Sequence, residues 1–291
     1  MSKAYVTVLI TAILAACSSA VNAQPVKCRA CDCKTVKGVP YASIASKDGR
    51  RGCSADSAGF FFASLTDTVR ITSIGYKSKN TAISTISPNA NGLRVVCLDE
   101  ELAQTDEVVI NGRKSGKRDL IKLASYSKKR EKGVLHGQPG CQLAVRMVNT
   151  QNRAGLIEEI SFKFEMENKK QLANLRLRVY NVNMRDKNLP GNDLLLDNVI
   201  LTPKNGWVSV NVSKYSIPFP KNGAYIGLEW IESNIISPIG QRVEPGICYA
   251  FDKSCASSVE CFRQHGWKPD FFAEDIGQGC MMLKMKVSFN R

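Results

Sequence analysis

The sequence predicts an all-β protein built of two antiparallel β-sandwiches. Three observations support this: apolar and polar residues alternate with a period of two, Gly and Pro turn signals separate the alternating segments, and no long amphipathic helical pattern stands out. With 291 residues, of which 44% are hydrophobic, the chain is long enough for two domains that each bury a core. We expect the second domain, residues 133–291, to be a jelly-roll-like sandwich.

The alternation is clearest in the second domain. Hydrophobic residues occupy every second position in four segments: 160–166, 175–179, 208–212 and 283–289. A period of two places one set of side chains in a core and the other in water, so Arg176 and Arg178 are predicted to face solvent. The tetrapeptide Pro-Lys-Asn-Gly occurs at 203–206 and again at 220–223, and Asn-Gly is typical of tight turns.

Residues 1–23 are predicted to be an export signal. The apolar run from Ala4 to Ala16 is too short to span a bilayer, and Ala23 ends a small-x-small cleavage site. The segment Leu14–Cys17 resembles a bacterial lipobox, in which Cys17 would be lipidated; cleavage after Ala23 is favoured because a polar segment precedes it. In both cases the chain is exported to the periplasm, the outer-membrane surface or the medium. No transmembrane segment is predicted, and membrane attachment is expected only with lipidation.

The cysteine content agrees with export. Apart from Cys17, ten cysteines are disulfide candidates in an oxidising compartment: Cys28, Cys31, Cys33, Cys53, Cys97, Cys141, Cys248, Cys255, Cys261 and Cys280. Five lie in each half, so either one disulfide joins the halves or each half keeps a thiol. The Cys28-x-x-Cys31-x-Cys33 spacing could chelate zinc, but it lacks a second Cys pair or a nearby His, and disulfides are favoured. No metal or cofactor is predicted.

Residues 113–132 form a strongly basic linker. They hold nine Lys and Arg against Asp119 and Glu131, a net +7 that is over half of the +13 expected for the chain from Gln24 onward. A solvated linker is the favoured interpretation; the alternative is a patch for lipopolysaccharide or an acidic glycan, formed by Arg113, Lys114, Lys117, Arg118, Lys128, Lys129 and Arg130. Nucleic acid is not expected, because only Tyr126 could stack on bases. A short helix is expected over 120–126.

Four motifs in the first half point to a known domain family. Gly38–Ile44 is similar to a G-x-P-x-x-A-x-I/V strand, Ser54–Phe61 to a T-D-x-x-G-x-F turn, Asp67–Ser78 to an L-x-x-S-x-I-G-Y-x-S strand, and Glu107–Ile110 to a closing L-x-E-V-V-V strand. Residues from about 33 to 112 thus resemble the carboxypeptidase-D regulatory-like domain, a transthyretin-like β-sandwich. The resemblance implies that residues 24–112 form a non-catalytic accessory domain, of the kind found on exported proteins of Gram-negative bacteria.

Core candidates in both halves are aromatic or β-branched. They are Phe60, Phe61, Ile71, Tyr76, Trp207 and Trp230. Gly59 and Gly75 are expected to permit the bends that the first domain needs.

The sequence contains no recognised catalytic motif. His136 and His265 lie in no zinc-protease pattern, and no nucleophile elbow, P-loop or dinucleotide fingerprint is present. We therefore expect the protein not to be an enzyme. A glycoside hydrolase using Asp270, Glu274 or Asp275 is the less favoured alternative, because neighbouring acids without known geometry are weak evidence.

Trp267, in a cysteine-rich loop, is the best single candidate for a ligand contact. With Asp270, Phe271 and Phe272 it forms a candidate sugar-binding site, because aromatic faces stack on sugar rings and carboxylates accept from hydroxyls. For Trp267 itself, packing in the core is the favoured interpretation, because large aromatic side chains are mostly buried. The expected function is non-enzymatic binding or a structural role at the cell envelope or surface, with an envelope protein or a glycan as partner. A carbohydrate-binding module is the more specific alternative.

Overall fold

The computed structural model describes residues 25–101, 118–127, 132–167, 173–238, 243–251, 258–263, 266–269 and 279–290. These residues form strands and two short 3-10 helices, η1 (Ile83–Thr85) and η3 (Ser213–Tyr215), without any α-helix. The predicted all-β fold class is therefore confirmed. Among the same residues, none belongs to a helix with the length and apolar character needed to cross a membrane.

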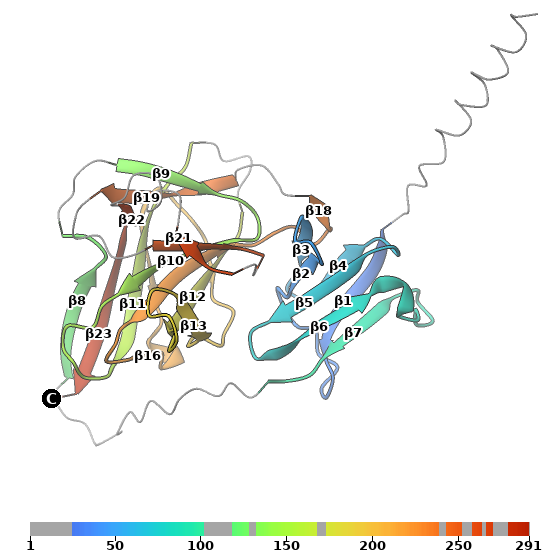
Figure 1. Cartoon of the computed structure of the whole chain (residues 1–291), viewed down its shortest axis with the longest axis horizontal. Coiled ribbons are helices and arrows are strands. Elements are labelled where there is room, and N and C mark those ends of the chain that lie inside the picture. Colours follow the sequence, from blue (N-terminus) through green and yellow to red (C-terminus); the bar gives the residue numbers. More distant parts are fainter. Residues whose placement is uncertain are drawn as a thin grey trace, which may run out of the picture.

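The first sandwich packs a three-stranded sheet, in the order β4-β1-β7, against a five-stranded sheet, in the order β18-β3-β2-β5-β6 (Figure 1). All its paired strands are antiparallel except β1 and β7, which run parallel. The bounds are β1 (Val26–Asp32), β2 (Ser43–Ser46), β3 (Arg51–Ser54), β4 (Phe60–Ala63), β5 (Thr68–Ser73), β6 (Tyr76–Ala82), β7 (Arg94–Leu98) and β18 (Ser237–Pro238).

The predicted core of the first sandwich is confirmed in part. Phe61 and Ile71 are fully buried between the two sheets. Phe60 is only half-buried, and the ammonium group of Lys27 lies 4.3 Å from its ring centroid. Tyr76 is half-buried and packs against the edge of this core.

Two glycines adopt backbone conformations that explain their place in the motifs of the first domain. Gly59 has φ +85°, and a Cβ there would lie 2.4 Å from the carbonyl oxygen of Ala30. Gly75 has φ +78° at the turn between β5 and β6. Since side-chain-bearing residues rarely adopt such angles, both predicted bends need glycine.

The second sandwich packs two larger sheets together. One has the order β13-β12-β17-β10-β20-β21, with β14 paired to β12; the other has the order β22-β19-β11-β23-β8, with β15 and β16 paired to β11 and β9 to β19. The bounds are β8 (Arg118–Ala124), β9 (Lys132–Gly137), β10 (Cys141–Met147), β11 (Gly155–Glu165), β12 (Leu175–Val182), β13 (Pro190–Asp193), β14 (Ile200–Leu201), β15 (Gly206–Asn211), β16 (Pro218–Phe219), β17 (Ala224–Trp230), β19 (Val243–Phe251), β20 (Ser258–Phe262), β21 (Lys268–Pro269), β22 (Gly279–Met281) and β23 (Leu283–Asn290).

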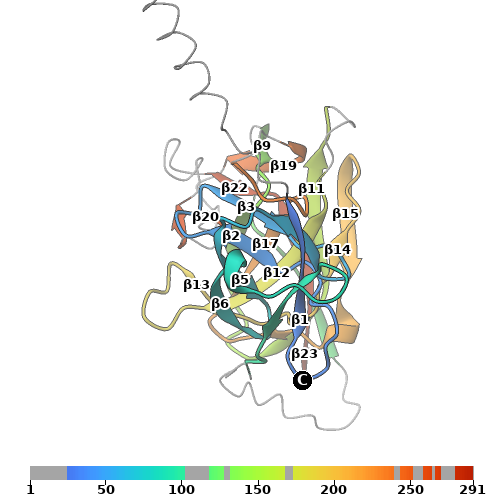
Figure 2. The ribbon, with the colours of Figure 1, turned by 90° about the vertical axis from the view of Figure 1, so that its right-hand side faces the viewer.

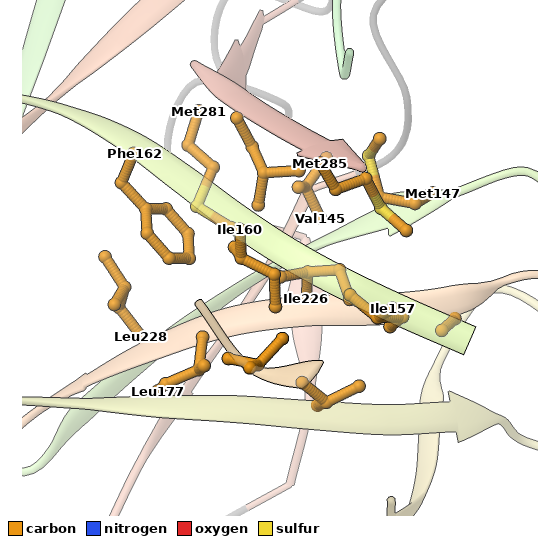
Figure 3. Packing of buried hydrophobic residues seen from close by; sticks show 14 of the residues in the cluster. Val145, Met147, Ile157, Ile160, Phe162, Leu177, Ile226, Leu228, Met281 and Met285 are labelled. Atoms are coloured by element: carbon orange, nitrogen blue, oxygen red, sulfur yellow. The ribbon is translucent and has the colours of Figure 1, made fainter. Parts of the chain in front are cut away.

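Hydrophobic side chains from both large sheets meet in one core (Figure 3). Ile160 and Phe162 of β11 face Leu177 of β12 and Leu228 of β17, as the period of two predicts. Trp230 is fully buried, and its indole N–H donates to the carbonyl oxygen of Pro245 at 3.1 Å. The predicted core role of Trp230 is thus confirmed.

Trp207 is less buried than predicted. It is half-buried on the face of the eight-stranded sheet that points away from the main core, where it packs against the small cluster of Cys248, Ala250 and Met282. The ammonium group of Lys284 lies 4.3 Å from its ring centroid. Both predicted Pro-Lys-Asn-Gly turns end in a glycine with positive φ: +88° at Gly206 and +86° at Gly223.

The helix expected over 120–126 is wrong. Residues 118–124 form strand β8, which pairs antiparallel with β23 at the edge of the sheet. Ile121 and Leu123 pack against the core while Leu120 and Lys122 point outward, so the segment follows a period of two. Strand β8 therefore belongs to the second sandwich, although it falls within the predicted linker 113–132.

Only one residue of the proposed anionic-partner patch lies in the described residues. Arg118 is exposed on β8, and its guanidinium lies 3.9 Å from Glu158. The other patch residues lie outside the described residues: Arg113, Lys114, Lys117, Lys128, Lys129 and Arg130.

The two sandwiches are joined by backbone hydrogen bonds as well as by chain connectivity. After β17 the chain crosses to the first sandwich, where the amide of Phe62 donates to the carbonyl of Asn234 at 2.7 Å and the amide of Ile236 donates to the carbonyl of Phe62 at 3.0 Å. Strand β18 then pairs with β3 (Figure 1), and Figure 2 views the molecule from the side of the first sandwich. Ile236 packs against the first core. The first sandwich therefore uses residues beyond the predicted 24–112.

A disulfide joins Cys33 and Cys97, with Cα atoms 4.7 Å apart. It closes a loop within the first half, so it is not the inter-domain bridge considered above. Cys31 stands opposite Cys97 in the β1–β7 register but keeps its thiol, because Cys97 is already bonded to Cys33.

Three other disulfide candidates also carry thiols in the structure: Cys28, Cys53 and Cys141. Cys255 lies outside the described residues. The pairing of Cys248, Cys261 and Cys280 stays a prediction.

We expect the thiols of Cys28, Cys53 and Cys141 to resist alkylation in the folded protein. Burial raises the pKa of Cys28 to about 11 and that of Cys141 to about 12, and it raises the pKa of Cys53 well above its ordinary value. Because the thiolate is the reactive form, these residues should be modified only after unfolding. Peptide mass mapping should show them labelled in denaturant without reductant, and Cys33 and Cys97 only after reduction. Labelling of Cys33 without reductant would contradict the assigned pairing.

Candidate ligand-binding cleft between the two sandwiches

The outer face of the β12–β17–β10 sheet is polar but buried. Arg176 and Arg178, predicted to face solvent, are only 2% and 6% exposed, so this prediction is wrong. The first sandwich covers this face: Nη1 of Arg176 donates to the carbonyl oxygen of Tyr41 at 3.0 Å. The alternation correctly places both arginines on the side opposite the second core. It does not reveal that another domain lies against that side.

Glu229 forms ion pairs with both arginines. Nε and Nη2 of Arg176 donate to its two carboxylate oxygens at 3.0 and 2.8 Å, and Nη1 of Arg178 donates to Oε2 at 3.3 Å. Burial raises the pKa of Glu229, but the charges of Arg176 and Arg178 outweigh burial and the net direction is downward. Glu229 is therefore ionised at neutral pH.

Arg178 also orients an aromatic hydroxyl. Its Nε donates to Oη of Tyr180 at 2.9 Å, and that hydroxyl donates to Oε1 of Gln142 at 2.5 Å. Burial raises the pKa of Tyr180, so the phenol stays protonated. The Trp267 ring stands edge-on to the Tyr180 ring, with centroids 5.3 Å apart. An arginine, two aromatic rings and an amide are thus held together.

These side chains line one side of a cleft of about 430 Å³, and the first sandwich lines the other. A second hollow of about 740 Å³ adjoins it and shares Ser73, Ile74, Tyr76, Glu101 and Asp193 with it. The first sandwich contributes the β5–β6 hairpin, which contains the Ile-Gly-Tyr motif of the family resemblance. The volumes are in the range of sites that bind small organic molecules.

Asp193 lines the cleft and forms an ion pair with Arg178. Its Oδ2 accepts from Nη2 of Arg178 at 3.2 Å, whereas Oδ1 is buried and accepts no hydrogen bond within the described part of the chain. Oδ1 does lie 3.0 Å from the same Nη2, so the two groups attract each other electrostatically. Burial raises the pKa of Asp193, and Arg178 only partly offsets this.

A second buried ion pair fixes the relative position of the sandwiches. Nε of Arg263 donates to Oε1 of Glu232 at 3.1 Å, and its Nη1 reaches the carbonyl oxygen of Gly49 in the first sandwich at 3.0 Å. Gly52 of β3 leaves room for this side chain, because a Cβ there would lie 2.7 Å from Nε of Arg263. The cleft is therefore held open between two domains that are tied at several points.

The structure places one predicted ligand contact in this cleft. Trp267 is half-buried and lines it, whereas its predicted companions lie outside the described residues: Asp270, Phe271 and Phe272. The acids of the hydrolase alternative, Glu274 and Asp275, lie outside them as well, as does His265.

Sequence analysis missed most of the cleft. It did not single out Gln142, Tyr180 or Asp193, and it placed Arg178 in solvent. The available signal was the Arg-x-Arg-x-Tyr spacing on one face of a strand, from residue 176 to residue 180. That spacing shows a polar face but cannot show that the face is covered.

No protein family model matches the chain. No curated protein matches it either. Among solved structures, similar chains come from the T13 IBDV viral particle and from the infectious bursal disease virus Gt strain; each is 10% identical and covers 91% of this chain, with a TM-score of 0.24. This chain spans only 55% and 57% of their lengths. At such TM-scores the likeness carries no argument about fold or function.

We expect Glu229→Gln to destabilise the protein by about 3–5 kcal/mol, because it leaves Arg176 and Arg178 buried with one acid fewer. Denaturant unfolding at pH 7 measures the change. Glu159→Gln is the matched control: Glu159 pairs with Lys286 at 2.9 Å in a partly exposed position, and its loss should cost less than about 1 kcal/mol. Equal small effects of the two substitutions would show that the buried network does not stabilise the fold.

Proposed function

We propose that the protein is an exported, non-enzymatic binding protein of the cell envelope or surface, and that it holds a glycan in the cleft between its two sandwiches. The observation that carries this proposal is the position of Trp267. The tryptophan lines the cleft together with Tyr180, whose ring it meets edge-on, and Tyr76 lines the cleft from the first sandwich. Aromatic rings beside fixed donors and acceptors suit sugars, which present both apolar C–H faces and hydroxyls.

The polar groups of the cleft are suited to hydroxyl-rich ligands. Gln142 and Asp193 offer acceptors, and Arg70 and Arg178 offer donors. Arg178 holds Asp193, and Tyr180 holds Gln142, so these groups are positioned before a ligand arrives. Preorganisation of this kind lowers the entropic cost of binding.

The remaining features support an exported protein with an accessory first domain. The Cys33–Cys97 disulfide is typical of oxidising compartments. The hairpin that lines the cleft also carries the Ile74-Gly75-Tyr76 motif of the carboxypeptidase regulatory-like resemblance. Under this proposal the first sandwich completes the binding site of the second.

We expect Trp267→Ala to abolish retention on the glycan that the wild-type protein binds, while the circular dichroism spectrum is unchanged. Affinity electrophoresis against a panel of envelope and plant polysaccharides measures retention. Trp207→Ala is the matched control, because Trp207 is also half-buried but lies on the outer face of the other sheet beside Lys284. Unchanged retention of Trp267→Ala, or equal losses in both variants, would contradict a glycan site in the cleft.

A further inference from the structure

Away from the cleft, three side chains from separate parts of the chain bring metal-ligating atoms together. His136 lies on β9, Glu244 on β19, and Glu167 follows the end of β11. One nitrogen of the imidazole and one oxygen of each carboxylate all lie within 4.8 Å of one another. The sequence predicts no metal site here, because the residues form no spacing motif.

Strand pairing and a glycine position the histidine. His136 stands opposite Gly246 in the β9–β19 register, and its Nδ1 lies 3.7 Å from Oε2 of Glu244. A Cβ on Gly246 would lie 3.1 Å from Nδ1 of the imidazole and 2.3 Å from Cγ1 of Val134. Glycine therefore leaves the space in which the imidazole approaches the carboxylate.

Backbone amides orient the buried carboxylate. Oε2 of Glu244 accepts from the amide of Gly246 at 3.2 Å, and Oε1 accepts from the amide of Glu167 at 3.3 Å. The hydrogen bond from the amide of Glu167 also holds residue 167 beside Glu244. Glu244 is only 7% exposed, whereas Glu167 is exposed. The cluster therefore lies at the protein surface with one buried ligand and one exposed ligand, and an ion can enter it from solvent. Outer hydrogen bonds of this kind are typical of carboxylates that bind metals.

We propose that His136, Glu167 and Glu244 bind a divalent transition-metal ion, with Zn²⁺ as the representative of the class. Two carboxylates balance the charge of the ion, and an imidazole ligand favours zinc-like ions over Mg²⁺ and Ca²⁺, which prefer oxygen. Zinc–ligand bonds of about 2.0–2.2 Å place tetrahedral ligands roughly 3.3–3.6 Å apart, close to the observed 3.7 Å between His136 and Glu244. Three protein ligands leave a fourth position for water or another donor.

The test titrates the full chain, dialysed free of metal, with Zn²⁺ and separately with Ca²⁺ by calorimetry. We expect one Zn²⁺ per chain, and weak or no Ca²⁺ binding. His136→Gln and Glu244→Gln should each lower Zn²⁺ affinity at least about 100-fold, since even outer-shell changes cost about 10–100-fold. His265→Gln, which removes the other histidine of the sequence, is the matched control and should bind as the wild type does. Absence of Zn²⁺ binding, or wild-type affinity in His136→Gln, would overturn the proposal.

A spectroscopic measurement on the wild type separates this site from the cysteines and does not require a stable variant. Co²⁺ bound to imidazole and carboxylates gives visible bands without thiolate-to-cobalt charge transfer, whereas ions held by cysteines such as Cys28 or Cys31 would show that charge transfer. Bands without charge transfer, displaced by one equivalent of Zn²⁺, support the assignment. Charge-transfer absorption at one equivalent, or no bands, contradicts it.

Discussion

The burial of Arg176 and Arg178 between the two sandwiches is the constraint on which the arrangement of the domains depends. Removing a guanidinium from water costs several kcal/mol even after relaxation, so each charge must be met by fixed partners. Glu229 and Asp193 supply the opposite charges from the same sheet, and the first sandwich contributes the carbonyl of Tyr41. Separating the sandwiches would remove the hydrogen bond from Arg176 to Tyr41 and would expose the sheet face that carries both arginines. The cleft beside this network is therefore a consequence of how the domains pack.

Local sequence pattern predicted the strands well because strand geometry is local. The period of two located β11, β12, β15 and β23, and Asn-Gly located two turns whose glycines have positive φ. The same pattern gave wrong predictions where burial or strand formation depends on contact with a distant part of the chain. Polar residues at 176 and 178 are buried because a domain covers them, and residues 118–124 form a strand because the edge of β23 accepts one.

The candidate sites were less predictable for the same reason. Trp267 could be singled out because a large aromatic residue in a cysteine-rich loop is unusual without a role in packing or binding. Tyr180, Asp193 and Gln142 come from three strands, and only their pairing in a sheet brings them to one wall. His136 and Glu244 are likewise separated by more than a hundred residues, and the β9–β19 register joins them. No spacing rule applied to the sequence could find either set.

The charge of the cleft differs from that of the protein, and this bears on what the cleft can bind. The chain carries a net charge of +14, yet the charged residues that line the cleft are two arginines, Arg70 and Arg178, and two acids, Glu101 and Asp193. The adjoining hollow adds Lys77 and Glu100, which again balance. A balanced wall gives no net attraction to an anion, and its groups act through directed hydrogen bonds instead. The cleft therefore suits a neutral, hydroxyl-rich glycan, whereas an acidic partner would be attracted to the excess positive charge on other surfaces of the molecule.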